Sequence, residues 1–240
     1  YRVINFMVNP MNDGSTSFFF NSVGGYHAAK PRRYQELFDF QIANNNIEVL
    51  NMLNTRYIIY PGEENRESVQ LNEDANGNAW FVEEIEWVGS ADQEIRALDS
   101  LNTKRTAVVN REYEGFLAGF QPRRELDSQI ELTSYAPNEM RYRSNSESEQ
   151  LAVFSEMFYE HGWNAYVDGE LTPHFRVNYV LRALRIKGGE HEIVFKFEPG
   201  VIETGNRVTL VSYFLLLLIP GAWYLIDRKR DVQNYPEKTV

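Results

Sequence analysis

The chain has 240 residues, of which 43% are hydrophobic and 14% aromatic, enough for one or two domains with a sizeable core. Residues 1–206 carry 31 acidic and 19 basic side chains, a net charge of −12. This acidity argues against binding to nucleic acid or to anionic lipid, because both need a basic face. The absence of cysteine excludes a disulfide framework and thiolate metal sites.

The first part of the chain, residues 1–125, is predicted to form a small mixed α/β domain. Apolar residues recur at helical spacing in residues 31–42 and 47–53, with three asparagines between them, and a capping pattern at Ser90 opens a helix to about residue 101. Strands are expected at residues 56–60, 80–88 and 106–109, and residues 62–78 are polar and loop-like. Alternation of helices and strands indicates a small layered structure.

Residues 126–203 are predicted to form an antiparallel β-sandwich of jelly-roll or immunoglobulin-like type. Short candidate strands follow one another at residues 130–133, 139–143, 151–158, 163–167, 180–187 and 191–197. Asp168-Gly169 is a strong hairpin-turn dipeptide, and Gly188-Gly189 separates the last two strands. Regular short strands with glycine turns are typical of a sandwich. Together with the mixed α/β part at residues 1–125, this sandwich gives an expected fold class of α+β.

Residues 208–226 run without a charge and are long enough to cross a bilayer as a helix. The alternative is a buried core helix, but such helices are usually shorter, and Pro220-Gly221 is better tolerated in a membrane. Arg228, Lys229 and Arg230 follow at once, and basic residues beside a span are retained in the cytoplasm. We therefore expect a transmembrane helix at residues 207–227, a cytoplasmic, disordered tail at 228–240, and residues 1–206 outside the cytoplasm.

The start of the chain shows neither an initiator methionine nor a signal peptide. A protein with a single C-terminal span would leave the basic cluster on the outer side, against the usual charge bias. We therefore expect this chain to be the C-terminal part of a longer protein whose earlier portion carries further spans.

Residues 21–34 (NSVGGYHAAKPRRY) form the first candidate binding segment. Gly24 and Gly25 allow a tight turn or close approach to a ligand, and His27 is a candidate acid or base. Arg32 and Arg33 lie at a predicted helix N-terminus, where they suit phosphate or carboxylate, and Tyr26 is the remaining predicted contact. The alternative is a plain turn with solvated basic residues.

Residues 159–169 (YEHGWNAYVDG) form the second candidate segment. Trp163 and Tyr166 suggest an aromatic platform for a sugar ring, with Asp168 accepting from hydroxyl groups. The interpretation that we favour is structural, because Trp163 begins a strand that suits the sandwich core and Asp168 is explained by the turn. Trp163 is nevertheless retained as a candidate ligand contact.

Other chemistry is not supported by the residue pattern. The four histidines share no zinc-ligand spacing, and Glu83, Glu84 and Glu86 suit the solvated face of a strand. Nucleophile and nucleotide-binding motifs do not occur. We predict no metal site, no cofactor and no catalytic residue in this chain.

Several strings in order resemble the C-terminal extracytoplasmic region of the YfhO family of bacterial membrane proteins, in the form found in Bacteroidetes. They are residues 23–30 (VGGYHAAK), 32–37 (RRYQEL), 49–58 (VLNMLNTRYI), 77–82 (GNAWFV), 162–169 (GWNAYVDG) and 178–184 (NYVLRAL). The resemblance covers most of residues 1–203 and the final helix. Pro31 and the pair Glu160-His161 depart mildly from the family pattern.

This resemblance implies a polytopic protein of the bacterial cytoplasmic membrane, similar to GT-C glycosyltransferases that use polyprenyl-phosphate-linked sugars on the outer side. Such enzymes are similar in placing an acidic catalytic residue in an early outer loop, which would precede Tyr1. The implied partners are the lipid bilayer, the sugar carrier, an envelope glycan and the remaining membrane part of the same protein.

The leading hypothesis is that this chain binds the acceptor or shapes the site of a sugar-transfer protein. The alternative is a non-catalytic glycan-binding or assembly domain. An independent hydrolase of the outer face has weak support, because no nucleophile or carboxylate pair stands out.

Overall fold

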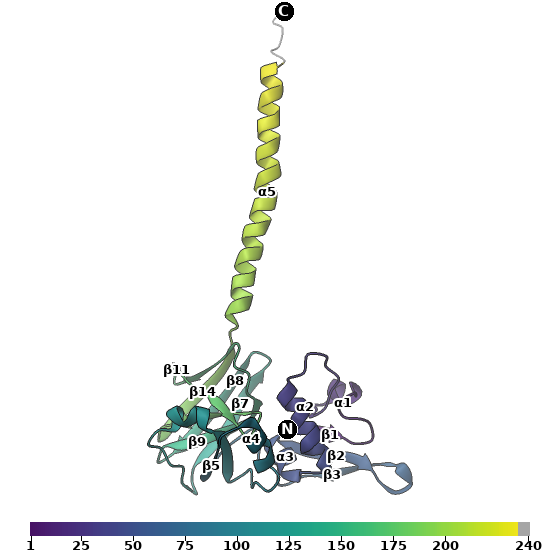
Figure 1. Cartoon of the computed structure of the whole chain (residues 1–240), viewed down its shortest axis with the longest axis vertical. Coiled ribbons are helices and arrows are strands. Elements are labelled where there is room, and N and C mark those ends of the chain that lie inside the picture. Colours follow the sequence, from purple (N-terminus) through teal and green to yellow (C-terminus); the bar gives the residue numbers. More distant parts are fainter. Residues whose placement is uncertain (235–240) are drawn as a thin grey trace, which may run out of the picture. The chain divides into compact units, whose positions relative to one another are not determined.

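The computed structural model describes residues 1–234, which fall into two units that are treated separately (Figure 1). Tyr1–Phe197 form one compact unit that contains every strand of the described residues. The second unit starts at Glu198 and contains one long helix, α5 (Gly200–Asn234). The other helices are α1 (Ser15–Phe19), α2 (Arg32–Phe40), α3 (Ile47–Met52) and α4 (Ala91–Ala97), with 3₁₀ turns η1 (Ile42–Asn44), η2 (Glu63–Asn65) and η3 (Arg111–Leu117).

The smallest sheet has three strands in the order β1-β2-β3 (Arg2–Asn5, Thr55–Pro61 and Glu67–Leu71). β1 runs parallel to β2, and β3 antiparallel to it. The predicted helices α2 and α3 are confirmed and belong to the chain between β1 and β2. Asn46 starts α3, because its side chain accepts hydrogen bonds from the backbone N–H groups of Glu48 and Val49.

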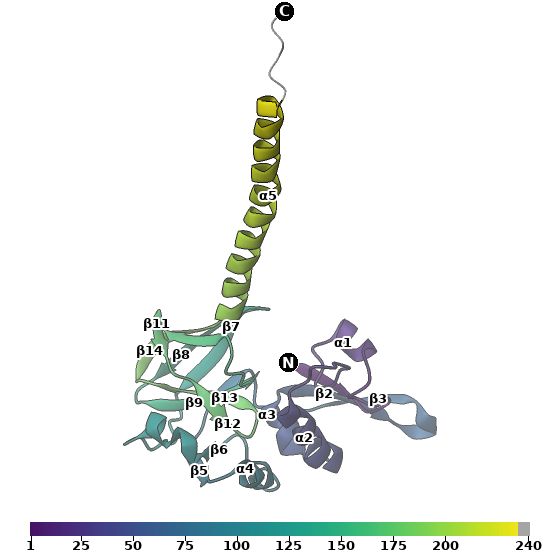
Figure 2. The same cartoon turned by 45° about the horizontal axis from the view of Figure 1, so that its top comes forward.

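Two larger sheets pack face to face (Figure 2). One has the order β11-β10-β14-β8-β7 (Glu170–Thr172, Trp163–Val167, Gly189–Phe197, Glu139–Ser146 and Gln129–Ala136). The other has the order β4-β9-β13-β12-β6-β5 (Ala79–Phe81, Gln150–Met157, Leu181–Ile186, Phe175–Val177, Thr106–Asn110 and Glu84–Val88). Most strand pairs are antiparallel, and the predicted α+β class is confirmed.

The core between the two larger sheets is aromatic. Tyr142, Phe154 and Phe195 are fully buried, and their rings meet edge to face with centroids 4.8–6.1 Å apart. Edge-to-face packing is a favoured arrangement of aromatic rings and adds to the stabilisation from burial. This cluster joins β8, β9 and β14, and so locks the two sheets together.

The central strands of the six-stranded sheet are buried on both faces, whereas its edge strand β5 exposes Glu84 and Glu86. Along β9, Ala152 and Phe154 point to the aromatic core, whereas Leu151 and Val153 belong to a second core shared with α2 and α3. A strand covered on both sides lacks polar alternation, which explains the nearly continuous apolar run of residues 151–154.

This sheet also differs from the predicted division of the chain at residue 125. It combines β4, β5 and β6 from before that position with β9, β12 and β13 from after it. Residues on both sides of 125 therefore share backbone hydrogen bonds and one core, and they form a single compact unit.

Local differences from the sequence-based expectation have simple causes. The strand expected at residues 80–88 is two strands, β4 and β5, in different positions of the sheet. The segment 62–78, expected to be loop, contains β3, a mostly exposed edge strand whose apolar pattern is weak. The predicted turn after β10 is confirmed, because Asp168 and Gly169 both have positive φ angles, of 51° and 85°.

Helix α5 contains the predicted membrane span. Gly200–Arg228 are long and apolar enough to cross a membrane, and the most apolar window has no buried residue. The helix starts earlier than expected, at Gly200, and continues to Asn234, so that residues 228–234 of the predicted disordered tail are helical. The remaining residues of that predicted tail, 235–240, lie outside the described residues.

The aromatic core generates a stability prediction. Phe154→Ala should lower the free energy of unfolding by about 3–5 kcal/mol, because the vacated space lies between two sheets that are held by strand pairing. Urea unfolding of the detergent-solubilised chain, followed by circular dichroism, measures this change. Leu171→Ala, on an exposed side chain of β11, should change it by less than about 0.5 kcal/mol. Equal effects of the two changes would contradict the assigned core.

Candidate functional site

A cavity of about 430 Å³ lies where β9 and β13 meet the N-terminal segments of the first unit. Its lining comes from Arg2 of β1, residues 22–24, the start of α2, Leu53, the end of β9 with the two residues after it, the first residue of β10 and one residue of β13. The cavity brings together Gly24 and Trp163, which belong to the two segments that the sequence indicated as candidate sites.

Trp163 supplies apolar surface to this cavity. It begins β10, and its ring lies 5.4 Å from that of Phe197 and 4.8 Å from the guanidinium carbon of Arg182. It also packs against the aromatic core, which is the structural role that the sequence favoured. The residue therefore contributes to the sandwich core and lines the cavity.

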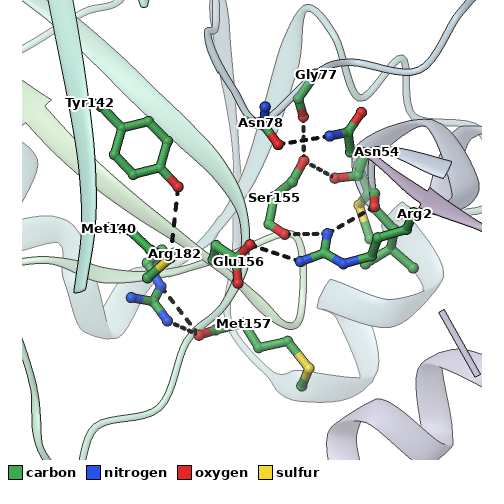
Figure 3. Close-up of polar contacts among 12 residues, drawn as sticks. Arg2, Asn54, Gly77, Asn78, Met140, Tyr142, Ser155, Glu156, Met157 and Arg182 are labelled. Carbon is green, nitrogen blue, oxygen red and sulfur yellow. Dashed lines mark hydrogen bonds and ion pairs between the residues drawn. The ribbon is translucent and has the colours of Figure 1, made fainter. Parts of the chain in front are cut away.

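Arg182 is the main residue of this site that the sequence did not indicate. It is 2% exposed, and its Nε and Nη2 atoms donate to the carbonyl of Met157 at 3.2 and 2.6 Å (Figure 3). Its Nη1 atom has no hydrogen-bond partner, and no ion pair holds the guanidinium among the described residues. Burial lowers the pKa of Arg182 to about 10, so it stays charged at neutral pH.

One wall of the cavity is held by an ion pair between Arg2 and Glu156, with Nη2 and Oε1 2.9 Å apart. Arg2 Nη1 also donates to the backbone oxygens of Leu53 and Ser155, at 2.9 and 2.6 Å. These contacts join β1 and the end of α3 to the end of β9 (Figure 3). The carboxylate is therefore fixed in position against Arg2.

A short polar network extends behind this wall. The Ser155 hydroxyl lies 2.8 Å from the carbonyl oxygen of Met52 and 2.6 Å from that of Gly77, and Asn54 donates to Asn78 at 2.9 Å (Figure 3). The Ser155 contacts join β9 to the last residue of α3 and to the loop before β4, and they keep the polar end of β9 ordered.

The local backbone conformation requires glycine at both Gly24 and Gly25. A Cβ atom on Gly24 would lie 2.1 Å from the carbonyl oxygen of Pro10, and Gly25 donates to that oxygen at 2.7 Å. Gly25 also has a φ angle of 141°, which other residues rarely adopt. The close approach predicted for these glycines is therefore made with the chain itself, while Gly24 also lines the cavity.

Three of the predicted contacts lie on the surface and are not among the residues that line this cavity. Tyr26 is 73% exposed, and the Nδ1 atom of His27 accepts from the backbone N–H of Ala29. Arg32 pairs with Glu36 one helical turn later at 2.8 Å. Such exposed pairs contribute little stability.

Arg33 is part of an internal ion pair. Its Nη1 atom lies 2.6 Å from Oε2 of Glu94, whose side chain is fully buried, and its guanidinium stacks on Tyr179 at 4.5 Å. Burial raises the pKa of Glu94, and the charge of Arg33 opposes this shift. Arg33 thus joins α2 to α4 and is also absent from the cavity lining.

The second candidate segment does not form a shared platform. Trp163 and Tyr166 lie on opposite faces of β10, because successive side chains alternate along a strand. Asp168 accepts from the backbone N–H of Glu192 and from His191, with distances of 2.9 and 2.6 Å. The hydrogen bond with His191 is the main cause that lowers the pKa of Asp168. Its role is in the turn, as favoured from sequence.

His174 lies behind the cavity. Its ring centroid is 5.4 Å from that of Phe158, which lines the cavity, and 5.6 Å from that of Phe195. Nε2 is buried without a hydrogen-bond partner. Burial, aided by the positive charge of Arg182, lowers the pKa of His174 to about 4. The imidazole is therefore neutral at neutral pH.

The site contains the groups of a binding cavity and not those of a metal centre. Within residues 1–234, no group of three or more His, Asp or Glu side chains is placed to hold a metal ion. The sole carboxylate of the cavity lining is Glu156, already paired with Arg2. An indole and two guanidinium groups can hold a polar, ring-shaped ligand, but a pair of carboxylates for acid and base catalysis is missing from the lining.

A signal for Arg182 was present in the sequence. Residues 180–186 (VLRALRI) are predicted as a strand, and Arg182 falls on the same face as Leu184 and Ile186. Both of those side chains are buried in the aromatic core. A charged residue on an apolar face of a strand is costly unless it is paired, which makes it a candidate for function.

Comparison with known proteins identifies a family match for part of the chain. Residues 99–209 match the family described as bacterial membrane protein YfhO. The matched region contains Trp163, Arg182 and the start of α5, whereas Arg2 and Gly24 precede it. No curated protein and no solved structure matches the chain significantly.

The Arg33–Glu94 pair generates a stability prediction. Arg33→Met should lower the free energy of unfolding by about 3–5 kcal/mol, because a buried carboxylate loses its counter-charge. Adding Glu94→Gln should recover part of that loss. Urea unfolding of the single and double variants tests the coupling, and an Arg33→Met variant as stable as the parent would show that the pair has no structural role.

His174 generates a pH prediction. Its pKa is about 4 in the folded protein, whereas an unfolded histidine has a pKa of about 6.5. As pH falls from about 6.5 to 4, the unfolded chain gains a proton that the folded protein does not take, so stability falls by up to about 3 kcal/mol. His174→Gln should flatten this part of the stability profile, measured by unfolding at a series of pH values. An unchanged slope would contradict the assignment.

Proposed function

Because the chain belongs to the YfhO family of bacterial membrane proteins, we propose that its first unit is a saccharide-binding domain of a sugar-transfer protein. In this proposal the domain binds an envelope glycan, or shapes the site in which a sugar leaves a polyprenyl-phosphate carrier. The chemical step is assigned to a membrane-embedded part of a longer protein, and no residue of this chain is given a catalytic role.

The observation that carries the proposal is the composition of the cavity. Trp163 offers apolar surface for the C–H groups of a sugar ring, and Arg2, Glu156 and Arg182 offer donors and an acceptor for hydroxyl groups. Ligand cavities of this size combine aromatic walls with a few polar groups that fix orientation. Of the predicted contacts, Gly24 and Trp163 remain in the proposal as lining residues.

The membrane topology supports the same proposal. The protein is membrane-associated, and α5 provides a candidate span. Arg228, Lys229 and Arg230 favour a cytoplasmic C-terminal end, which would expose residues 1–206 outside the cytoplasm, where envelope glycans lie. Only Glu198 and Pro199 lie between β14 and α5 in the sequence, so the domain is tethered by a very short connection.

A second function, a non-catalytic glycan-binding or assembly domain, is favoured by one observation. Glu156, the sole carboxylate of the lining, is committed to Arg2, so the cavity has no free acid and base. Both proposals share the saccharide cavity and differ in whether sugar transfer depends on it. The same observation counts against an independent glycoside hydrolase, which needs two carboxyl groups flanking the bond.

Saccharide binding is tested with the detergent-solubilised full chain and a panel of neutral and acidic mono- and disaccharides, by saturation-transfer NMR and titration. Trp163→Ala should weaken binding about tenfold, because ring contact is worth on the order of 1.4 kcal/mol. Tyr26→Ala removes an exposed aromatic residue outside the cavity and should leave affinity unchanged.

Thermal unfolding of both variants controls for loss of structure, since Trp163 also packs against the core. Binding that survives Trp163→Ala in a folded protein, or that is lost equally in Tyr26→Ala, would overturn the assignment of the cavity. Glycan modification is then measured in cells that carry Trp163→Ala in the full-length protein. Loss of modification supports the transfer role, and unchanged modification supports the assembly role.

A further inference from the structure

We propose that the cavity contains an anion-binding subsite at Arg182, so that its ligand is a saccharide with a negatively charged substituent, either a carboxylate or a phosphate. This inference rests on the proposed saccharide-binding function and adds the charge of the ligand to it.

Arg182 is a buried cation without a counter-ion. It is 2% exposed, its two hydrogen bonds go to one backbone carbonyl, and its Nη1 atom has no partner. Burying a charge without a paired opposite charge costs several kcal/mol. Because Arg182 lines the cavity, an anion bound there would supply the missing charge.

The neighbouring groups do not supply it. The charge of Glu156 raises the pKa of Arg182, but the carboxylate makes its ion pair with Arg2, at 2.9 Å, and none with Arg182 among the described residues. Tyr142 and Tyr135 are near enough to influence Arg182, but burial raises the pKa of both phenols and keeps them neutral. The charged residues of the lining are thus two arginines and one glutamate, an excess of one positive charge.

Unlike Arg182, each partly buried arginine of the domain has a carboxylate partner. These pairs are Arg2–Glu156 at 2.9 Å, Arg33–Glu94 at 2.6 Å, Arg141–Glu139 at 2.7 Å, Arg176–Glu112 at 2.9 Å and Arg185–Glu149 at 2.8 Å. Arg185 lies on the same strand as Arg182, three residues later. The chain is rich in acidic residues, 34 against 24 basic ones, so a missing partner at Arg182 is not explained by a shortage of carboxylates.

The surroundings hold the guanidinium in place for a ligand. Its carbon lies 4.8 Å from the ring of Trp163 and 4.9 Å from that of Phe195, and Met157 fixes two of its nitrogens. Contact with aromatic rings offsets part of the cost of burial and restricts the side chain. A ring-shaped ligand against Trp163 therefore lies close to a positioned cation.

The test uses the detergent-solubilised full chain and four probes at matched ionic strength: glucose, glucuronate, glucose 6-phosphate and inorganic phosphate. The parent chain should bind one or both charged sugars at least about tenfold more tightly than glucose, because charge-assisted hydrogen bonds are the stronger ones. Comparison of glucuronate with glucose 6-phosphate decides between carboxylate and phosphate.

Arg182→Met should abolish the preference for charged sugars, and Arg182→Lys should keep part of it. Arg185→Met is the matched control, because it removes an arginine from the same strand outside the cavity, and the preference should remain. Arg182→Met should also unfold at a temperature no lower than Arg185→Met, because it removes an unpaired charge and leaves no carboxylate behind. The melting temperature of every variant is measured with and without glucuronate.

The outcomes separate the two proposals. If glucose binds as tightly as the charged sugars and Arg182→Met changes nothing, the anion subsite is wrong while saccharide binding stands. If inorganic phosphate binds through Arg182 but Trp163→Ala has no effect on any probe, the anion subsite stands and the saccharide function is wrong. If no probe binds, both are wrong.

Discussion

The six-stranded sheet is the layer on which the rest of the first unit depends, because its central strands are buried on both faces. One face packs against the five-stranded sheet through Phe154, and the other against the helices through Leu151 and Val153. Burial on two sides removes water from the backbone of β9 and β13, and so requires complete strand pairing there.

The cavity follows from the point where this buried sheet ends. β9 is apolar through Phe154 and then changes to Ser155 and Glu156, whose polar groups bond to β1 and to the loops behind it. β13 starts beside this point, and the register between β9 and β13 shifts between its first two residues, Leu181 and Arg182. Polar groups are thus concentrated where the sheet stops being covered on both sides, and the space left there is lined by charge and by aromatic rings.

Charge pairing distinguishes the structural arginines from the one to which we assign function. The Arg33–Glu94 pair joins two helices, and its two charges compensate each other in a buried position. Arg182 is more deeply buried than Arg33 but has no such compensation among the described residues. A protein that retains an uncompensated charge next to a cavity gains a binding site at the expense of stability, which is why the ligand is expected to be anionic.

The sequence by itself determined the elements that local residue patterns encode: the membrane span, helices and a hairpin turn. The apolar run of residues 208–226 indicated the span, helical spacing located α2 and α3, and Asp168-Gly169 located a hairpin. Each of these depends on residues within a few positions of one another, because helix period, strand alternation and turn conformation are properties of a short segment. The α+β class followed from their order along the chain.

The tertiary structure alone decided which distant segments meet. The pairing of strands from both sides of residue 125, the ion pair of Arg33 with a residue 61 positions away, and the joining of Gly24 to Trp163 in one cavity have no local signature. The pattern of residues 180–186 placed Arg182 on an apolar face, but its lack of a partner became visible only when every neighbouring carboxylate was positioned. Burial of a charge is a property of all the segments that surround it, and a sequence orders those segments along the chain without placing them in space.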